Sequence, residues 1–170
     1  MLSSPSPIPT RRILVVDDNP AIHEDFRKIL CPVEAETESS LNSVEATLFE
    51  EADPGPAGAK FSVDSAFQGQ EALVKVRAAA DLGRPYSLAF IDVRMPPGWD
   101  GIETITQIWK EFPATQMVIC TAYSDYTWQE VFRELGETDN LVILKKPFDN
   151  LEVMQLAYAL TKKYLLNLQA

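Results

Sequence analysis

The sequence predicts an α/β protein built on a doubly wound parallel sheet with helices on both faces. Short apolar runs of strand length alternate with segments whose apolar residues recur at helical spacing along most of the chain. Such alternation requires parallel strands joined by right-handed helical crossovers. Residues 86–92 are apolar nearly throughout, which is typical of a strand buried on both faces of a parallel sheet.

Five strands and five helices are expected in alternation. The expected strands are residues 12–16, 61–66, 86–92, 116–120 and 141–144. The second strand alternates polar and apolar residues enough to lie at an edge of the sheet. Between the first helix and the second strand, residues 31–59 predict an inserted amphipathic helix and a loop.

Each expected helix has one apolar face and a start or stop signal. Asn19 is placed to cap the first helix, and Pro20 fits its first turn, where a missing N–H costs nothing. Pro113 ends the third helix, and Asp149 or Asn150 caps the last one. The apolar faces are expected within residues 22–30, 73–80, 102–112, 131–135 and 153–164.

The net charge of the 170-residue chain is −10, which disfavours nucleic acid as a direct ligand. It suits local binding of cations or docking on basic partner surfaces. Cys31 and Cys120 are too few for a disulfide framework and indicate reduced thiols. No apolar run approaches the roughly 18 residues of a membrane span, and the Ser/Pro-rich start lacks the order of a signal peptide. We therefore expect a cytoplasmic protein that binds neither nucleic acid nor membranes.

Polar side chains stand at the carboxyl ends of four expected strands. Asp17 and Asp18 follow the first strand, Asp92 the third, Thr121 the fourth and Lys146 the fifth. The carboxyl ends of parallel strands meet at one edge of an open α/β sheet, where ligands bind. Three crowded carboxylates repel one another unless a cation compensates, and Mg²⁺ is the hard cation that prefers oxygen ligands. The sequence thus predicts a Mg²⁺ site at this edge.

This arrangement predicts phosphoryl chemistry at Asp92. With Mg²⁺ on Asp18 and Asp92, and with Asp17 acting through water, one oxygen of Asp92 stays free to attack a phosphoryl group. Lys146 would pair with one phosphoryl oxygen, and the Thr121 hydroxyl would donate to another. The peptide bond between Lys146 and Pro147 is expected to be cis, which turns the ammonium inward.

Together the motifs resemble those of a two-component response-regulator receiver domain of the CheY-like superfamily. The resemblance spans about residues 12–165. It rests on Ile-Leu-Val-Val-Asp17-Asp18-Asn19, then Asp92 with Met95-Pro96 and Asp100-Gly101, then Thr121-Ala122, then Lys146-Pro147-Phe148. Each motif is common alone, and their combination in this order is specific.

The resemblance implies a flavodoxin-like (βα)5 sheet with strand order 2-1-3-4-5. It also implies that Asp92 accepts a phosphoryl group from a sensor histidine kinase or a histidine phosphotransfer protein. Asp17, Asp18 and Asp92 would bind Mg²⁺, with the backbone carbonyl of Arg94 as a further ligand. The protein would not be an enzyme beyond catalysing its own phosphorylation and dephosphorylation.

The family also implies how the signal is read. Thr121 and Lys146 would sense the phosphoryl group and change a surface made of the fourth helix, the fifth strand and the fifth helix. Most receivers carry Tyr or Phe three residues before the lysine, whereas this chain has Ile143. We therefore expect helix and loop shifts instead of an aromatic side chain swinging inward. The turn over residues 97–99 is about one residue longer than in a typical receiver.

Domain boundaries are expected as follows: a flexible tail over 1–11, the receiver over 12–166 with its insertion over 31–59, and a helical extension over 160–170. The apolar end of the last helix, at Leu165, Leu166 and Leu168, indicates dimer pairing or a linker into a further domain. The chain would then be a single-domain relay or the receiver of a hybrid histidine kinase or other multidomain signalling protein.

Two other functions fit part of the pattern. One is a Mg²⁺-dependent aspartyl-phosphate phosphatase or transferase of the haloacid dehalogenase type, although that class needs Asp where Asn19 stands. The other is an interaction domain with a degenerate site that binds no Mg²⁺. His23, the only histidine, is interpreted as a solvated helix residue because the rest of a kinase histidine box is missing.

Overall fold

The computed structural model describes residues 11–31, 61–95, 98–122, 128–136 and 138–169. The expected insertion over 31–59 lies outside these ranges apart from Cys31, and the expected tail lies outside them apart from Arg11. The fold can therefore be compared with the expected strands and helices, but not with these two segments.

A five-stranded sheet forms the centre of the molecule, with the order β2-β1-β3-β4-β5 and every neighbouring pair parallel. This confirms the predicted flavodoxin-like topology and places the second strand at an edge. The strands are β1 (Arg11–Val16), β2 (Phe61–Ala66), β3 (Leu88–Asp92), β4 (Gln116–Thr121) and β5 (Leu141–Lys145).

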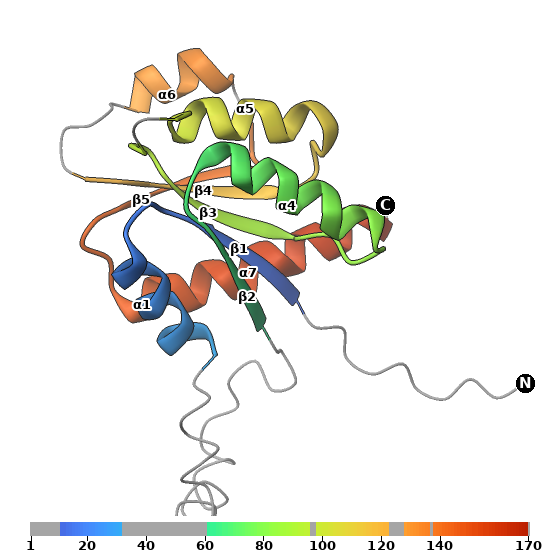
Figure 1. The fold of residues 1–170 in the computed structure, drawn as a ribbon, viewed down its shortest axis with the longest axis horizontal. Coiled ribbons are helices and arrows are strands. Elements are labelled where there is room, and N and C mark those ends of the chain that lie inside the picture. The colour runs from blue at the N-terminus through green and yellow to red at the C-terminus, as the bar shows by residue number, and fades with distance from the viewer. Residues whose placement is uncertain (1–10, 32–60, 96–97, 123–127, 137, 170) are drawn as a thin grey trace, which may run out of the picture.

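Helices cover both faces of the sheet, as Figure 1 shows. One face carries α4 (Gly69–Asp81), α5 (Gly101–Glu111) and α6 (Trp128–Leu135), and the other carries α1 (Pro20–Leu30) and α7 (Asn150–Gln169). Among the described helices, none combines the length and the hydropathy that crossing a membrane requires.

Two hydrophobic layers result from the alternation of side chains along the strands. In β3, Ala89 and Ile91 belong to the layer beneath α4 and α5, while Leu88 and Phe90 belong to the layer beneath α1 and α7. All four are at most 1% exposed. The continuous apolar run is thus explained by burial on both faces, which holds the end of β3 rigidly in the middle of the sheet.

The helix ends follow the predicted signals. The Asn19 side chain accepts a hydrogen bond from the Ala21 N–H at 3.0 Å, and α1 begins at Pro20. The Asp149 carboxylate accepts from the Leu151 N–H at 3.2 Å, which decides between the two residues predicted to cap the last helix. These caps fix where each helix leaves the carboxyl edge of the sheet.

Two sequence-based expectations need correction. His23 is not solvated but 1% exposed, because it shares the inner face of α1 with Phe26 and Leu30 and its ring packs against Phe67 at 4.4 Å. The third strand begins at Leu88, two residues later than expected, although the Ser87 N–H already bonds to the Arg12 carbonyl at 2.9 Å.

Truncating a side chain between α5 and the sheet should destabilise the whole domain. Ile105 on α5 is fully buried, so we expect Ile105→Ala to lower the free energy of unfolding by about 2 to 5 kcal/mol, through lost transfer energy and the cavity left behind. Leu151→Ala, at a side chain that is 70% exposed, should change it by no more than about 0.5 kcal/mol. Urea titration followed by circular dichroism measures both, and equal effects would contradict this account of the core.

Candidate functional site

Three carboxylates meet at the carboxyl edge of the sheet, where the sequence placed them. Asp17 and Asp18 directly follow β1, and Asp92 ends the neighbouring strand β3. One carboxylate oxygen of each lies within 4.8 Å of the others. Asp17 is buried, Asp92 is half-buried and Asp18 is exposed, so the cluster has one side open to solvent.

The loop that carries the acidic pair is fixed by hydrogen bonds on several sides. The Asp17 N–H donates to the Ala66 carbonyl at 3.1 Å, and the Asp17 side chain accepts from the Asn19 N–H at 2.9 Å. The Asp17 carbonyl lies 2.7 Å from Nε2 of His23. Because a carbonyl only accepts, Nε2 must carry the hydrogen, and the buried Nδ1 has no partner among the described residues.

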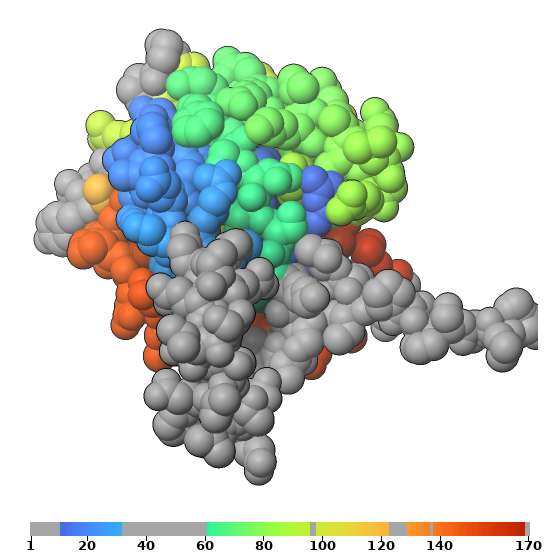
Figure 2. Space-filling model, turned by 60° about the horizontal axis from the view of Figure 1, so that its bottom comes forward, coloured from blue at the N-terminus to red at the C-terminus, as the bar shows by residue number. Residues whose placement is uncertain are grey.

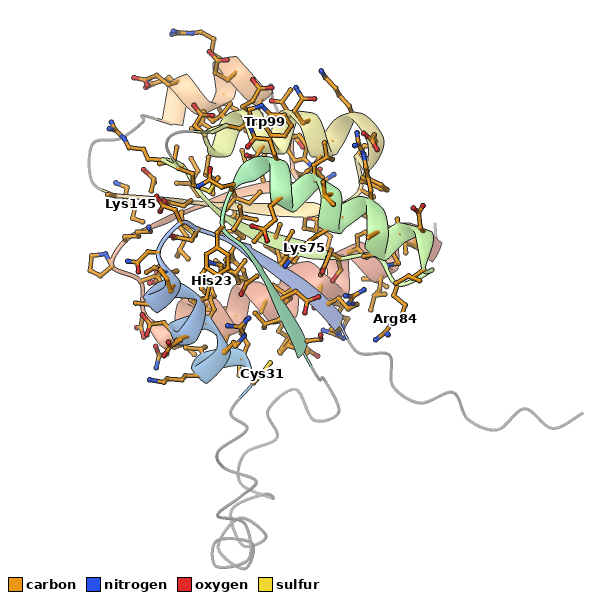
Figure 3. The ribbon with its side chains drawn as sticks, viewed as in Figure 1. His23, Cys31, Lys75, Arg84, Trp99 and Lys145 are labelled. Atoms are coloured by element: carbon orange, nitrogen blue, oxygen red, sulfur yellow. The ribbon has the colours of Figure 1, made fainter. Side chains whose placement is uncertain are left out.

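Lys146 brings a positive charge to the same point from the end of β5. Its ammonium donates to an Asp92 oxygen at 3.1 Å and to an Asp17 oxygen at 3.3 Å. The peptide bond to Pro147 is cis, as predicted, and the Lys146 N–H donates to the Thr121 carbonyl at 2.9 Å. Lys145, the alternative candidate, is exposed (Figure 3).

The charges in the cluster do not balance. Three carboxylates against one ammonium leave a formal charge of −2 when all are ionised. Burial and the nearby Asp17 carboxylate raise the pKa of Asp92, and Lys146 offsets only part of this. Burial alone would lower the pKa of Lys146, but Asp17 and Asp92 together outweigh it and raise that pKa. The cluster therefore favours an additional cation.

The remaining predicted site residues are placed near this cluster with less defined roles. Thr121 ends β4 beside Asp92 and is 5% exposed, and its hydroxyl donates to the Ala122 carbonyl at 3.0 Å. Arg94 lies two residues after Asp92, with an exposed side chain. Ile143 is half-buried and packs against the hydrophobic layer beneath α4 and α5, so it does not project toward solvent as a free side chain.

Gly101 allows α5 to start directly against the end of β3. A Cβ at this position would lie 2.5 Å from the Asp92 carbonyl oxygen and 2.9 Å from the Cα of Val93. Both contacts are with backbone, so any larger residue would displace the segment that carries Asp92. The Asp100-Gly101 pair therefore has a structural role: Asp100 caps α5 by accepting from the Glu103 N–H at 2.8 Å, and Gly101 permits the close approach.

The donor atoms fit a hard divalent cation. Asp17, Asp18 and Asp92 offer only carboxylate oxygens, which Mg²⁺ prefers. Cys120, which pairs with Asp92 across β3 and β4, is 3% exposed, and burial raises the pKa of its thiol, so it stays protonated. His23 uses its Nε2–H on the Asp17 carbonyl. The chemistry of the set thus agrees with Mg²⁺ and not with a soft metal.

Two comparisons connect this geometry to known proteins. The family model of the response regulator receiver domain matches residues 57–158. That stretch includes Asp92, Thr121 and Lys146 but begins after Asp17 and Asp18. In the folded chain, these two residues nevertheless lie beside Asp92. No curated protein matches the chain significantly.

Solved structures of similar fold cover nearly the whole chain. A CheY-like response regulator receiver domain protein from Methanospirillum hungatei is 20% identical with a TM-score of 0.61, over 93% of this chain and 98% of that one. A two component transcriptional regulator AraC from Clostridium phytofermentans is 24% identical with a TM-score of 0.59, over 94% and 98%. An adenylate cyclase structure from Rhodopirellula baltica is 22% identical with a TM-score of 0.65, over 94% and 93%. At these identities the likeness shows the fold.

Removing the charge of Asp92 should stabilise the metal-free protein at neutral pH. Because burial and Asp17 raise the pKa of Asp92 above its ordinary value of 3.8, its ionised form is less favourable in the fold than in the unfolded chain. This penalty is absent in acid and grows as pH rises through the raised pKa. We expect Asp92→Asn to unfold a few degrees higher than the parent at neutral pH in a chelator, with the gap closing in acid.

Thermal unfolding followed by circular dichroism at several pH values measures this difference. Asp81→Asn, which removes an exposed carboxylate outside the cluster, serves as the matched control. A lower unfolding temperature for Asp92→Asn at neutral pH would contradict the electrostatic account of the cluster.

Proposed function

Because the chain belongs to the response regulator receiver domain family, we propose that it accepts a phosphoryl group on Asp92 from a histidine kinase or a histidine phosphotransfer protein. The observation that carries this proposal is the convergence of two carboxylates and one ammonium on Asp92. An isolated aspartate would not be activated in this way, since phosphoryl transfer depends on positioning and on neutralising charge.

The proposed reaction exchanges one bond to phosphorus for another. A carboxylate oxygen of Asp92 attacks the phosphorus of a phosphohistidine, the new O–P bond forms, and the P–N bond breaks as the imidazole leaves with the electron pair. Lys146, which now contacts Asp92 at 3.1 Å, would turn toward a phosphoryl oxygen. The Thr121 hydroxyl would leave the Ala122 carbonyl and donate to a second phosphoryl oxygen.

Asp17, Asp18 and Asp92 would hold Mg²⁺, with the Arg94 carbonyl as a further ligand. When bound, the ion supplies positive charge that offsets the phosphoryl oxygens and the local charge of −2. The hydrogen bonds on Asp17 support this assignment, because they hold one ligand in place before a cation arrives.

Phosphorylation would be read at the surface formed by α6, β5 and α7. Lys146 directly follows β5, so its movement toward a phosphoryl group would shift the end of that strand. With Ile143 packed in the hydrophobic layer, the shift would pass through helices and loops. We also propose that the receiver domain spans residues 12–166. The end of α7, where Leu166 and Leu168 are exposed, would pair with a second copy or lead into another domain.

Phosphorylation by acetyl phosphate tests the acceptor. In the presence of Mg²⁺ the parent protein should gain the mass of one phosphoryl group, and Asp92→Asn should gain none, because the attacking oxygen is gone. Asp81→Asn should behave as the parent. Intact-mass spectrometry measures the gain, and labelling of Asp92→Asn to the level of the parent would sink the proposal.

A second assay separates the receiver from a phosphatase. A receiver takes up one phosphoryl group per protein and is not expected to turn over a phosphomonoester. Sustained release of phosphate from a small phosphomonoester, over many equivalents of protein, would favour an enzyme of the haloacid dehalogenase type instead.

A phosphoryl mimic tests the Mg²⁺ site. Beryllofluoride with Mg²⁺ should change the tryptophan fluorescence saturably, because Trp99 lies shortly before Asp100-Gly101, which packs on the end of β3. We expect Asp18→Asn to weaken the response at least tenfold, while Asp81→Asn leaves it unchanged. A response that needs no Mg²⁺, or none at all in the parent protein, would point to a degenerate interaction domain.

A further inference from the structure

We propose that the edge of the sheet between β2 and α4 is a docking site for an acidic amphipathic helix of a partner protein. This surface lies outside the aspartate cluster, and the proposal does not depend on phosphoryl transfer to Asp92. Figure 2 looks onto the face where α1 (blue) and α4 (green) flank β2. A hollow of about 430 Å³ opens there, with Arg27, Ser65, Phe67, Lys75 and Leu82 among its walls.

Two basic side chains from opposite faces of the sheet converge on Ser65. Arg27 reaches from α1 and donates to the Ser65 hydroxyl at 2.6 Å. Lys75 reaches from α4 toward the sheet and donates to the Ser65 carbonyl (Figure 3). Because both cations donate to Ser65, they lie close enough to repel each other. A carboxylate bound between them would relieve that repulsion.

The charges around the hollow are only partly compensated. Arg12, also in its wall, forms an ion pair with Asp64 at 2.8 Å, and Lys75 has Glu71 at 3.5 Å. Within the described part of the chain, Arg27 has no carboxylate within 4.0 Å. The hollow thus carries a local positive surplus in a protein whose net charge is −10. Its charge complements that of an acidic partner.

Apolar side chains are exposed beside these cations. Phe67 is 39% exposed, Val74 62% and Leu82 75%. Val74 lies on α4 and Leu82 is the C-cap residue of this helix, about two turns further on, with the small residue Ala78 between them. Three of the six large hydrophobic side chains exposed in the described residues therefore belong to this short stretch. An apolar stripe with a basic border matches the apolar face and acidic flanks of an amphipathic helix.

Pairing of an added strand with β2 is the competing mode, and the contacts argue against it. The Ala66 carbonyl faces β1, since it accepts from the Asp17 N–H, so the carbonyls of Phe61 and Ser65 face the free edge. The Ser65 carbonyl already accepts a hydrogen bond from Lys75, and the Phe61 carbonyl accepts one from the Cys31 S–H at 3.0 Å. An added strand would have to break both contacts, whereas a helix can dock through side chains alone.

The test uses a fluorescein-labelled amphipathic peptide made of glutamate and leucine, and fluorescence anisotropy as the readout. The protein as a whole repels such a peptide, so binding requires a local basic site. We expect saturable, salt-sensitive binding that weakens roughly tenfold in each of Arg27→Glu and Lys75→Glu. Lys110→Glu, at an exposed position on α5, should bind as the parent does.

A second pair of variants tests the apolar part. Leu82→Ser should weaken binding, while Leu151→Ser, at a comparably exposed leucine on α7, should not. A control peptide carries lysine in place of glutamate. The proposal is overturned if this control peptide binds equally well, if the charge reversals leave the affinity unchanged, or if inorganic phosphate at the concentration of the peptide displaces it. Self-association that the same charge reversals abolish would assign the surface to a second copy and would also overturn it.

Discussion

The hydrogen bonds from the Lys146 ammonium to Asp17 and Asp92 are the interaction on which the site depends. They join the end of β5 to the ends of β1 and β3, although β4 lies between β3 and β5 in the sheet. Carboxylates this close would otherwise repel one another, and partial burial strengthens that repulsion. Because the lysine offsets one charge of three, the cluster is stable enough to fold and still attracts a further cation. A second lysine would halve the formal charge of −2 and weaken that attraction.

The parallel sheet explains why these groups can be held so closely. Its central strand β3 is buried on both faces, so the position of Asp92 is set by packing in two layers and not by a loop. Gly101 then lets α5 start against the backbone of Asp92, which leaves no space for that segment to shift. On the other side, the Asp17 loop is fixed by Asn19 and His23. Rigidity of the cluster therefore comes from backbone contacts around it.

Sequence reasoning located the strand ends, and with them the convergence of Asp17, Asp18, Asp92 and Lys146, because apolar periodicity and chain breaks are local properties. It failed for His23 because that residue was interpreted from a missing kinase motif and not from its i, i+3 and i+7 spacing with Phe26 and Leu30. This spacing places the imidazole on the buried face, where it makes one hydrogen bond and one ring contact. Sequence reasoning also could not find the convergence on Ser65. Arg27 and Ser65 are 38 residues apart in sequence, and only the packing of α1 and α4 on opposite faces brings both cations to one edge.

A short chain of contacts connects the hollow beside β2 and α4 to the aspartate cluster. Phe67, in the wall of the hollow, packs against His23 at 4.4 Å, and His23 donates to the carbonyl of Asp17 at 2.7 Å. A helix that displaces Phe67 would therefore move the ring that holds the acidic loop. Any resulting change in cation affinity must be matched by an equal change in peptide affinity, because coupling between two binding sites is reciprocal. His23 is the side chain that joins the two sites, because it contacts Phe67 on one side and the Asp17 carbonyl on the other.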